Sequence, residues 1–120
     1  MTPLLDGLIV VDLSRVLAGP FASMRLADLG ARVIKIEEPL CGDPTRQFGP
    51  PFFEGEAAYF LAFNRGKESV ALDLKSATGV TVLERMLASA DVLLENFRPG
   101  ALAQLGFCSE RLKALAPRLI

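Results

Sequence analysis

Histidine is absent from this sequence of 120 residues, and cysteine is sparse. Without histidine, Ser-His-Asp and Cys-His catalysis is excluded within these residues, and so are the usual zinc sites. The two cysteines, Cys41 and Cys108, lie far apart and match no metal-binding or redox spacing, so we expect reduced thiols in preference to a disulfide. Chemistry performed by these residues alone would need carboxylates, lysines or a bound cofactor.

Further absences narrow the class of partner. No run of about 18 apolar residues is present, so the sequence predicts no membrane span. The formal net charge of -1 provides no overall basic field, so neither nucleic acid nor an anionic membrane is an expected partner. The N-terminal stretch MTPLLDGLIVVDLSR lacks the basic region and the cleavage site of a signal peptide, which predicts a cytoplasmic protein.

The composition that remains is typical of a globular domain. Hydrophobic residues make up 51% of the sequence and charged residues 22%, which indicates a chain that buries a core and is not disordered. A length of 120 residues fits one domain, although it is small for a whole enzyme.

The hydrophobic pattern alternates predicted strands with predicted helices. Strands are expected at 8–13, 32–37, 69–74 and 92–94. Helices are expected at about 20–29, within 56–66, at 77–88 and at 109–115. Ser76 and Ser109 are predicted N-caps, and the Pro- and Gly-rich stretch 38–55 is a predicted functional loop. This order predicts an α/β fold, with an open, mostly parallel sheet and flanking helices.

The end of the sequence differs from the end of a complete domain. Pro117 would terminate a helix, and the residues from Leu119 onward have the character of a strand that has just begun. We therefore expect the chain to be a truncated piece of a longer protein.

Basic residues follow several of the predicted strands. Ligands of open α/β sheets bind beyond the carboxyl ends of the strands, so these residues should gather at one edge. They are Arg15, Arg46, Lys75 and Arg98, with Lys67 just before the third strand. Each one taken singly is better explained as a solvated surface charge, whereas the group together indicates an anionic ligand with phosphates.

A dinucleotide site is the first generic candidate for such a ligand. Glu37 ends the second strand, where a ribose-binding carboxylate would stand. However, the turn SRVLAGPFA after the first strand has a single glycine and lacks G-x-G-x-x-G, and no G-x-x-x-x-G-K-[ST] is present. The sequence therefore does not predict NAD, FAD or P-loop nucleotide binding.

Several stretches resemble the N-terminal part of the family III CoA-transferases, the CaiB/BaiF group. They are VVDLSRVLAGPFASMRLADLGARVIKIEEP, GDPTR, AYFLAFNRGKESVALDLKS, ADVLLENFRPGALAQLGF and LAPRLI, and they cover nearly the whole chain. The family includes transferases that move CoA between carboxylic acids and the related 2-methylacyl-CoA racemases. The resemblance implies that residues 1–120 are the incomplete N-terminal part of a large, Rossmann-like domain that binds CoA or acyl-CoA without a metal.

The resemblance also implies which residues lie along CoA, and Arg46 is expected to add charge near its phosphates. The full set is Val16, Leu17, Ala18, Leu72, Asp73, Leu74, Lys75, Asn96, Phe97, Arg98 and Arg46. Two positions depart from the family pattern: Glu38 is acidic where many members have a basic residue, and Gln104 is neutral where some have arginine. Phe97 as a core aromatic, and Asp73 as an exposed acid or a partner of Lys75, stay open as alternatives.

The nucleophile of the family is not among these residues. In the transferases an aspartate attacks the acyl-CoA thioester, forming an aspartyl anhydride and then an aspartyl-CoA thioester. The resemblance implies that this aspartate lies beyond residue 120, so we expect the fragment alone to be inactive. At full length, an interlocked homodimer acting on an acyl-CoA and a carboxylic acid is expected. A 2-methylacyl-CoA racemase and a non-catalytic CoA- or nucleotide-binding module are the alternatives.

Overall fold

A four-stranded parallel sheet forms the centre of the protein, for which a computed structural model describes all residues 1–120. Its strands are β1 (Ile9–Asp12), β2 (Arg32–Glu37), β5 (Lys67–Ala71) and β6 (Val92–Leu94). They lie in the order β5-β2-β1-β6, and each neighbouring pair is parallel. This order is the third, second, first and fourth strand of a doubly wound sheet, which confirms the predicted α/β fold.

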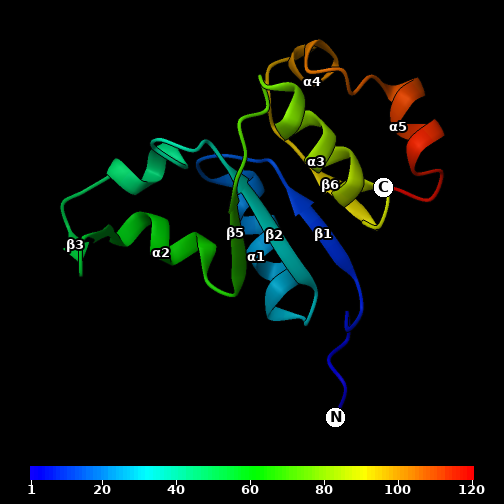
Figure 1. Ribbon diagram of the computed structural model, residues 1–120. Coiled ribbons are helices and arrows are strands. Elements are labelled where there is room, and N and C mark those ends of the chain that lie inside the picture. Colours follow the sequence, from blue (N-terminus) through cyan, green and yellow to red (C-terminus); the bar gives the residue numbers. More distant parts are fainter.

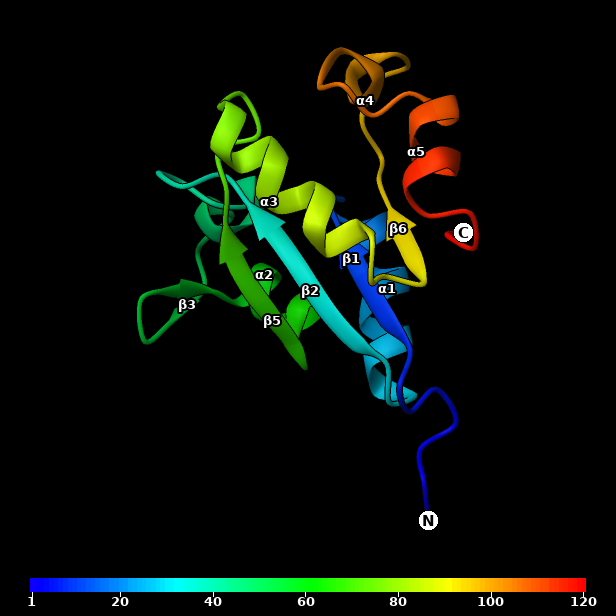
Figure 2. The same cartoon turned by 45° about the vertical axis from the view of Figure 1, so that its right-hand side comes forward.

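Helices cover both faces of the sheet (Figures 1 and 2). Helices α1 (Ala18–Asp28) and α2 (Ala58–Asn64) lie on one face, and α3 (Ala77–Leu87) lies on the other. The short helices α4 (Ala101–Gln104) and α5 (Ser109–Leu115) follow β6 on the side of α3. None of the helices is long and apolar enough to cross a membrane.

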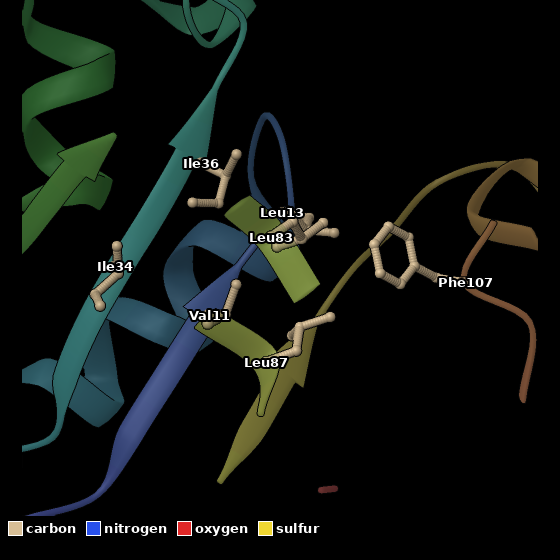
Figure 3. Close-up of a cluster of buried hydrophobic side chains, with 7 residues drawn as sticks. All are labelled: Val11, Leu13, Ile34, Ile36, Leu83, Leu87 and Phe107. Carbon is tan, nitrogen blue, oxygen red and sulfur yellow. The ribbon is translucent and has the colours of Figure 1, made fainter. Parts of the chain in front are cut away.

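The alternation of side chains along β1 and β2 divides the core into two clusters. Toward α3, the larger cluster holds Val11, Leu13, Ile34, Ile36, Leu83, Leu87 and Phe107 (Figure 3). Toward α1, the smaller cluster holds Val10, Ala31 and Val33, with Leu26 and Ala27 packed against it. Leu83 and Leu87 are fully buried, and each such side chain contributes about 1.5–3 kcal/mol relative to an exposed one.

The predicted loop at 38–55 contains short regular elements. A 3₁₀ helix, η1 (Pro44–Gln47), begins after Asp43, whose side chain accepts a hydrogen bond from the amide of Thr45. Strand β3 (Phe52–Phe53), near the end of the predicted loop, pairs with β4 (Glu56–Ala57), just beyond it, in a small antiparallel ribbon that leads into α2. The sequence indicated a loop here because none of these elements is long enough to produce a periodic pattern.

The predicted helix starts were right in one case and wrong in another. Ser76 caps α3 as predicted, since its hydroxyl accepts a hydrogen bond from the amide of Gly79 at 3.0 Å. Ser109 is not the cap of α5; it is the first helical residue, and Cys108 takes the cap position without a side-chain hydrogen bond. Helix α1 begins at Ala18, so Pro20 lies within its first turn.

The ends of two strands also differ from the prediction. Strand β5 stops at Ala71, three residues before the predicted end, and the segment Leu72–Lys75 then turns at Leu74 and Lys75 into α3. At the strand expected from Leu119, Ile120 pairs with the chain at β6. Its amide donates to the Asp91 carbonyl at 3.0 Å, and its carbonyl accepts from the Leu93 amide at 2.9 Å.

Candidate functional site

A cleft of about 280 Å³ opens at the carboxyl end of the sheet, on the face that α3 covers. Its apolar walls come from the ends of β1 and β2, the turn after β5, and the segment from Phe97 to α4. The lining residues are Leu13, Arg15, Ile36, Glu37, Glu38, Leu72, Asp73, Leu74, Lys75, Phe97, Ala101, Gln104 and Leu105. Ligands of open α/β sheets bind in this position, so the cleft is the candidate site.

The structure brings together five of the residues expected at the site. Leu72, Asp73, Leu74, Lys75 and Phe97 all line the cleft. Val16, Leu17, Ala18, Asn96 and Arg98 do not line the cleft; Val16 follows the lining residue Arg15, and Asn96 and Arg98 flank the lining residue Phe97 in the chain. Glu38 and Gln104, the two positions that depart from the family pattern, are both lining residues.

The turn Leu72–Lys75 is held closely against the start of α3. The Asp73 carboxylate accepts a hydrogen bond from the Lys75 amide at 2.9 Å, so Asp73 shapes the turn through the backbone and forms no ion pair with the Lys75 ammonium. Gly79 allows this packing, since a Cβ atom there would overlap the backbone carbonyl of Asp73. The Lys75 ammonium forms no ion pair, although its charge helps to lower the pKa of Glu38, which lines the same cleft.

Asn96 connects the segment after β6 to the turn after β1. Its side-chain oxygen accepts a hydrogen bond from the Arg15 amide, and its side-chain nitrogen donates to the Arg15 carbonyl, both at 2.9 Å. The next residue, Val16, has a φ of 70°, a left-handed conformation that β-branched residues rarely adopt. Asn96 therefore holds the backbone beside Val16. The family resemblance implied only that Asn96 lies along CoA.

Phe97 serves the core and the cleft together. Its ring packs against the larger core cluster, and it also lines the cleft. The Arg15 guanidinium lies 5.3 Å from the ring centroid, within the range of a cation–π interaction. Arg15 forms no ion pair, so its charge remains available to a ligand.

Arg46 lies outside the cleft, and its charge is already paired. Its guanidinium contacts Glu37 at 2.8 Å and Glu56 at 2.9 Å, and it lies 3.8 Å from the centroid of the Phe60 ring. Burial alone would raise the pKa of Glu37, but hydrogen bonds from Arg46, the Asp43 amide and Ser69 lower it to about 2. Because Arg46 is neutralised in this way, we do not include it among the ligand-binding residues.

Lys67 is also not a ligand-facing cation, and its inclusion in that group was wrong. Its ammonium is buried and contacts Asp12 at 3.2 Å, the Pro20 carbonyl at 2.9 Å and the Asn64 side chain at 2.9 Å. Burial lowers the pKa of Lys67, and the attraction of Asp12 opposes this shift only in part.

A second buried ion pair was not predicted from the sequence. The Lys35 ammonium lies 2.8 Å from the Asp43 carboxylate and donates to the Ser14 carbonyl at 2.9 Å. A signal was present, because a lysine inside a central strand covered on both faces must be buried and must find an acid. Its partner in a distant loop could not be identified from the pattern. No group of three or more histidine, cysteine, aspartate or glutamate side chains is arranged to hold a metal ion.

Comparison with known proteins identifies the family. Residues 5–120 match the sequence profile of CoA-transferase family III. The chain belongs to this family. It is 48% identical to mouse succinyl-CoA:glutarate CoA-transferase over 116 residues, which cover 97% of this chain and 27% of the mouse protein. It is 51% identical to the acetyl-CoA:oxalate CoA-transferase of Acetobacter aceti, covering 96% of this chain and 29% of that protein.

Solved structures agree with this family membership. The crystal structure of a CAIB/BAIF family protein from Brucella suis matches with a TM-score of 0.95 and 50% sequence identity. The match covers 100% of this chain and 32% of that protein. The chain therefore spans about a third or less of the length of these family III relatives.

Proposed function

We propose that the gene product containing these residues transfers CoA between carboxylic acids, and that residues 1–120 are the N-terminal part of its large CoA-binding domain. The observation that carries the proposal is the cleft. In this chain, which belongs to CoA-transferase family III, Leu72–Lys75 and Phe97 line it together. The cleft lies where α/β sheets bind nucleotides, and CoA contains a nucleotide.

The walls and the rim of the cleft suit different parts of CoA. The apolar side chains of Leu13, Leu72 and Phe97 offer a surface for the adenine ring or the pantetheine arm. Arg15 and Lys75 line the cleft without ion-pair partners, and the exposed Arg98 follows Phe97 directly. Hydrogen bonds from such cations to phosphate oxygens are charge-assisted and therefore strong.

The reaction itself needs an aspartate that these residues do not supply. An aspartate carboxylate would attack the thioester carbonyl of the acyl-CoA, release the CoA thiolate and form an acyl-aspartyl anhydride. The thiolate would then attack the aspartyl carbonyl, release the first acid and leave an aspartyl-CoA thioester. The second acid and the thiolate would reverse these two steps and give the new acyl-CoA. Residues 1–120 would hold the nucleotide end of CoA throughout.

A transfer assay on the complete gene product tests the proposal. Succinyl-CoA or acetyl-CoA would be mixed with glutarate or oxalate, the acids named for the relatives, and the new acyl-CoA measured by chromatography. We expect a new acyl-CoA and a hydroxylamine-sensitive acyl-enzyme. Epimerisation of a 2-methylacyl-CoA without transfer would instead identify a racemase, and CoA binding without turnover would identify a binding module.

The gene sequence and the oligomeric state provide two further checks. Sequencing the gene past codon 120 should reveal the aspartate in its transferase context, whereas a stop codon would favour the binding module. We also propose that the transferase is a homodimer, which sedimentation analysis of the complete gene product would test.

A further inference from the structure

A strained turn at the rim of the cleft is held by bonds from distant parts of the chain. Val16 lies in the turn between β1 and α1 with a φ of 70°. Residues held in such conformations tend to cluster at ligand sites, where the surrounding structure maintains them. The turn adjoins Arg15, which lines the cleft.

Three side chains hold the two residues before Val16. The Asp12 carboxylate accepts a hydrogen bond from the Ser14 amide at 2.8 Å, and the Lys35 ammonium donates to the Ser14 carbonyl at 2.9 Å. The Asn96 amide bonds to both backbone groups of Arg15. The backbone groups on both sides of the Ser14–Arg15 peptide bond are therefore fixed before the chain enters its strained conformation.

The Lys35 ammonium can hold the Ser14 carbonyl only because its own position is fixed. The Lys35 side chain is 2% exposed, and Asp43, its carboxylate partner at 2.8 Å, is 0% exposed. The other Asp43 oxygen accepts hydrogen bonds from the amide and the hydroxyl of Thr45 at 2.9 and 2.7 Å. The start of η1 thus fixes Asp43, Asp43 fixes Lys35, and Lys35 fixes the turn.

We propose that the Lys35–Asp43 pair is a latch that keeps the turn at residues 14–17, with Val16 in its left-handed conformation, ready to receive the ligand. Lys35 is then a positioning residue for CoA, which it does not contact. The proposal rests on the proposed function, because it names what prepares that site. Replacing a buried ion pair by apolar residues of similar volume is often neutral or stabilising, so the contribution we assign to this pair is conformational specificity.

Removing both charges together tests the latch. In the complete gene product, Lys35→Met with Asp43→Asn leaves no unpaired charge but deletes the bond to the Ser14 carbonyl. Loss of a hydrogen bond from a charged group predicts about 10-fold weaker binding of CoA in calorimetry. Amide hydrogen exchange at residues 14–17 should become faster. The matched control is Arg32→Met with Glu68→Gln, which removes an exposed ion pair at the opposite end of the sheet and should change neither quantity.

A double-mutant cycle with Val16→Gly separates a latch from a general structural support. Glycine adopts positive φ without strain, so it should favour the ligand-ready turn. In the unmodified protein that turn is already populated, so Val16→Gly would remove only the valine side chain and any contact that it makes with CoA. In the variant with Lys35→Met and Asp43→Asn (the latch-free variant), the same change should recover part of the lost CoA affinity. The turn conformation that binds CoA would then be more populated. If the two effects on affinity simply multiply, the latch is refuted.

The remaining outcomes are also decisive. If the Lys35 and Asp43 double variant does not fold, Thr45→Val takes its place, because it loosens Asp43 without removing a charge. About threefold weaker CoA binding is then expected, and unchanged binding overturns the proposal. If the unmodified protein does not bind CoA, the proposed function fails. The rates of amide hydrogen exchange at residues 14–17 still test the latch in that case, and unchanged rates in the latch-free variant refute it.

Discussion

The side-chain amide of Asn96 forms two hydrogen bonds with the backbone of Arg15, 81 residues earlier in the chain. It thereby joins the ends of β6 and β1, the two strands at which the strand order of the sheet reverses. Doubly wound sheets bind their ligands at this reversal. Asn96, which follows the apolar residues of β6, therefore holds Arg15 on the opposite wall of the cleft.

Removing the free cations of the cleft rim should weaken CoA binding. Charged hydrogen bonds are worth about 1.5–3 kcal/mol, so Lys75→Ala or Arg98→Ala should lower the affinity for CoA about 10- to 150-fold. The effect should appear mainly as a raised KM for acyl-CoA, with kcat reduced less, and it should shrink at high salt. Calorimetry and initial rates on the complete gene product measure both quantities.

Arg25→Ala is the control for these two variants, because Arg25 is an exposed cation on α1 that pairs with Asp28. Its affinity for CoA should equal that of the unmodified protein. Unchanged binding in both the Lys75 and Arg98 variants would mean that these side chains are solvated surface charges.

The network around Glu37 should make stability depend on pH in the acidic range. The folded pKa is lowered from 4.5 to about 2, so the stabilisation is complete well above pH 4.5 and is lost as the pH falls toward 2. Between pH 6 and pH 3 the loss should be about 2 kcal/mol in the free energy of unfolding in urea. Glu37→Gln should remove this part of the pH dependence.

Asp43 provides the background to that measurement. Its pKa is also lowered, since Lys35 and Thr45 outweigh the effect of burial, so a smaller acid dependence should remain in the Glu37→Gln variant. An identical pH dependence in the variant and the unmodified protein would contradict the role assigned to Glu37.

Gly79→Ala should destabilise the protein although alanine is the better helix former. The added methyl group would overlap the carbonyl of Asp73, so α3 or the turn Leu72–Lys75 must shift. Overpacking of this kind costs about 1–3 kcal/mol, which urea unfolding would detect. Thr78→Ala, at the adjacent exposed position of the same helix, should leave stability nearly unchanged or slightly raise it. Equal stability of the two variants would mean that the turn yields freely.

Residues 1–120 alone should catalyse no transfer of CoA between acids. The proposed nucleophile lies outside them, and the buried acids Asp12, Glu37 and Asp43 are each engaged by a cation within the fold. Chromatography of acyl-CoA products would measure transfer, and hydroxylamine treatment would reveal a covalent acyl-enzyme. An acyl-enzyme formed on these residues would show that one of their carboxylates is the nucleophile.

The sequence by itself determined which segments form the strands and helices, and the motif resemblance pointed to several residues of the cleft. Continuous apolar runs and helical periodicity report which faces are buried, and this is local information carried by neighbouring residues. The strands around Val11 and Ile34, the cap at Ser76 and the α/β order were therefore predictable. The motif resemblance likewise pointed to Leu72–Lys75 and Phe97, which the structure places around one cleft.

Only the tertiary structure decided which charges are free and which are already paired. Arg46 and Lys75 both follow strands and have equivalent sequence signals, yet Arg46 is neutralised by Glu37 and Glu56 while Lys75 is not. Lys35 finds Asp43, and Asn96 finds Arg15, across distances in sequence that no local pattern records. The energy of a charged or amide side chain depends on the partner that lies within about 3 Å of it. Only the folded arrangement of the strands and loops decides which residue that partner is.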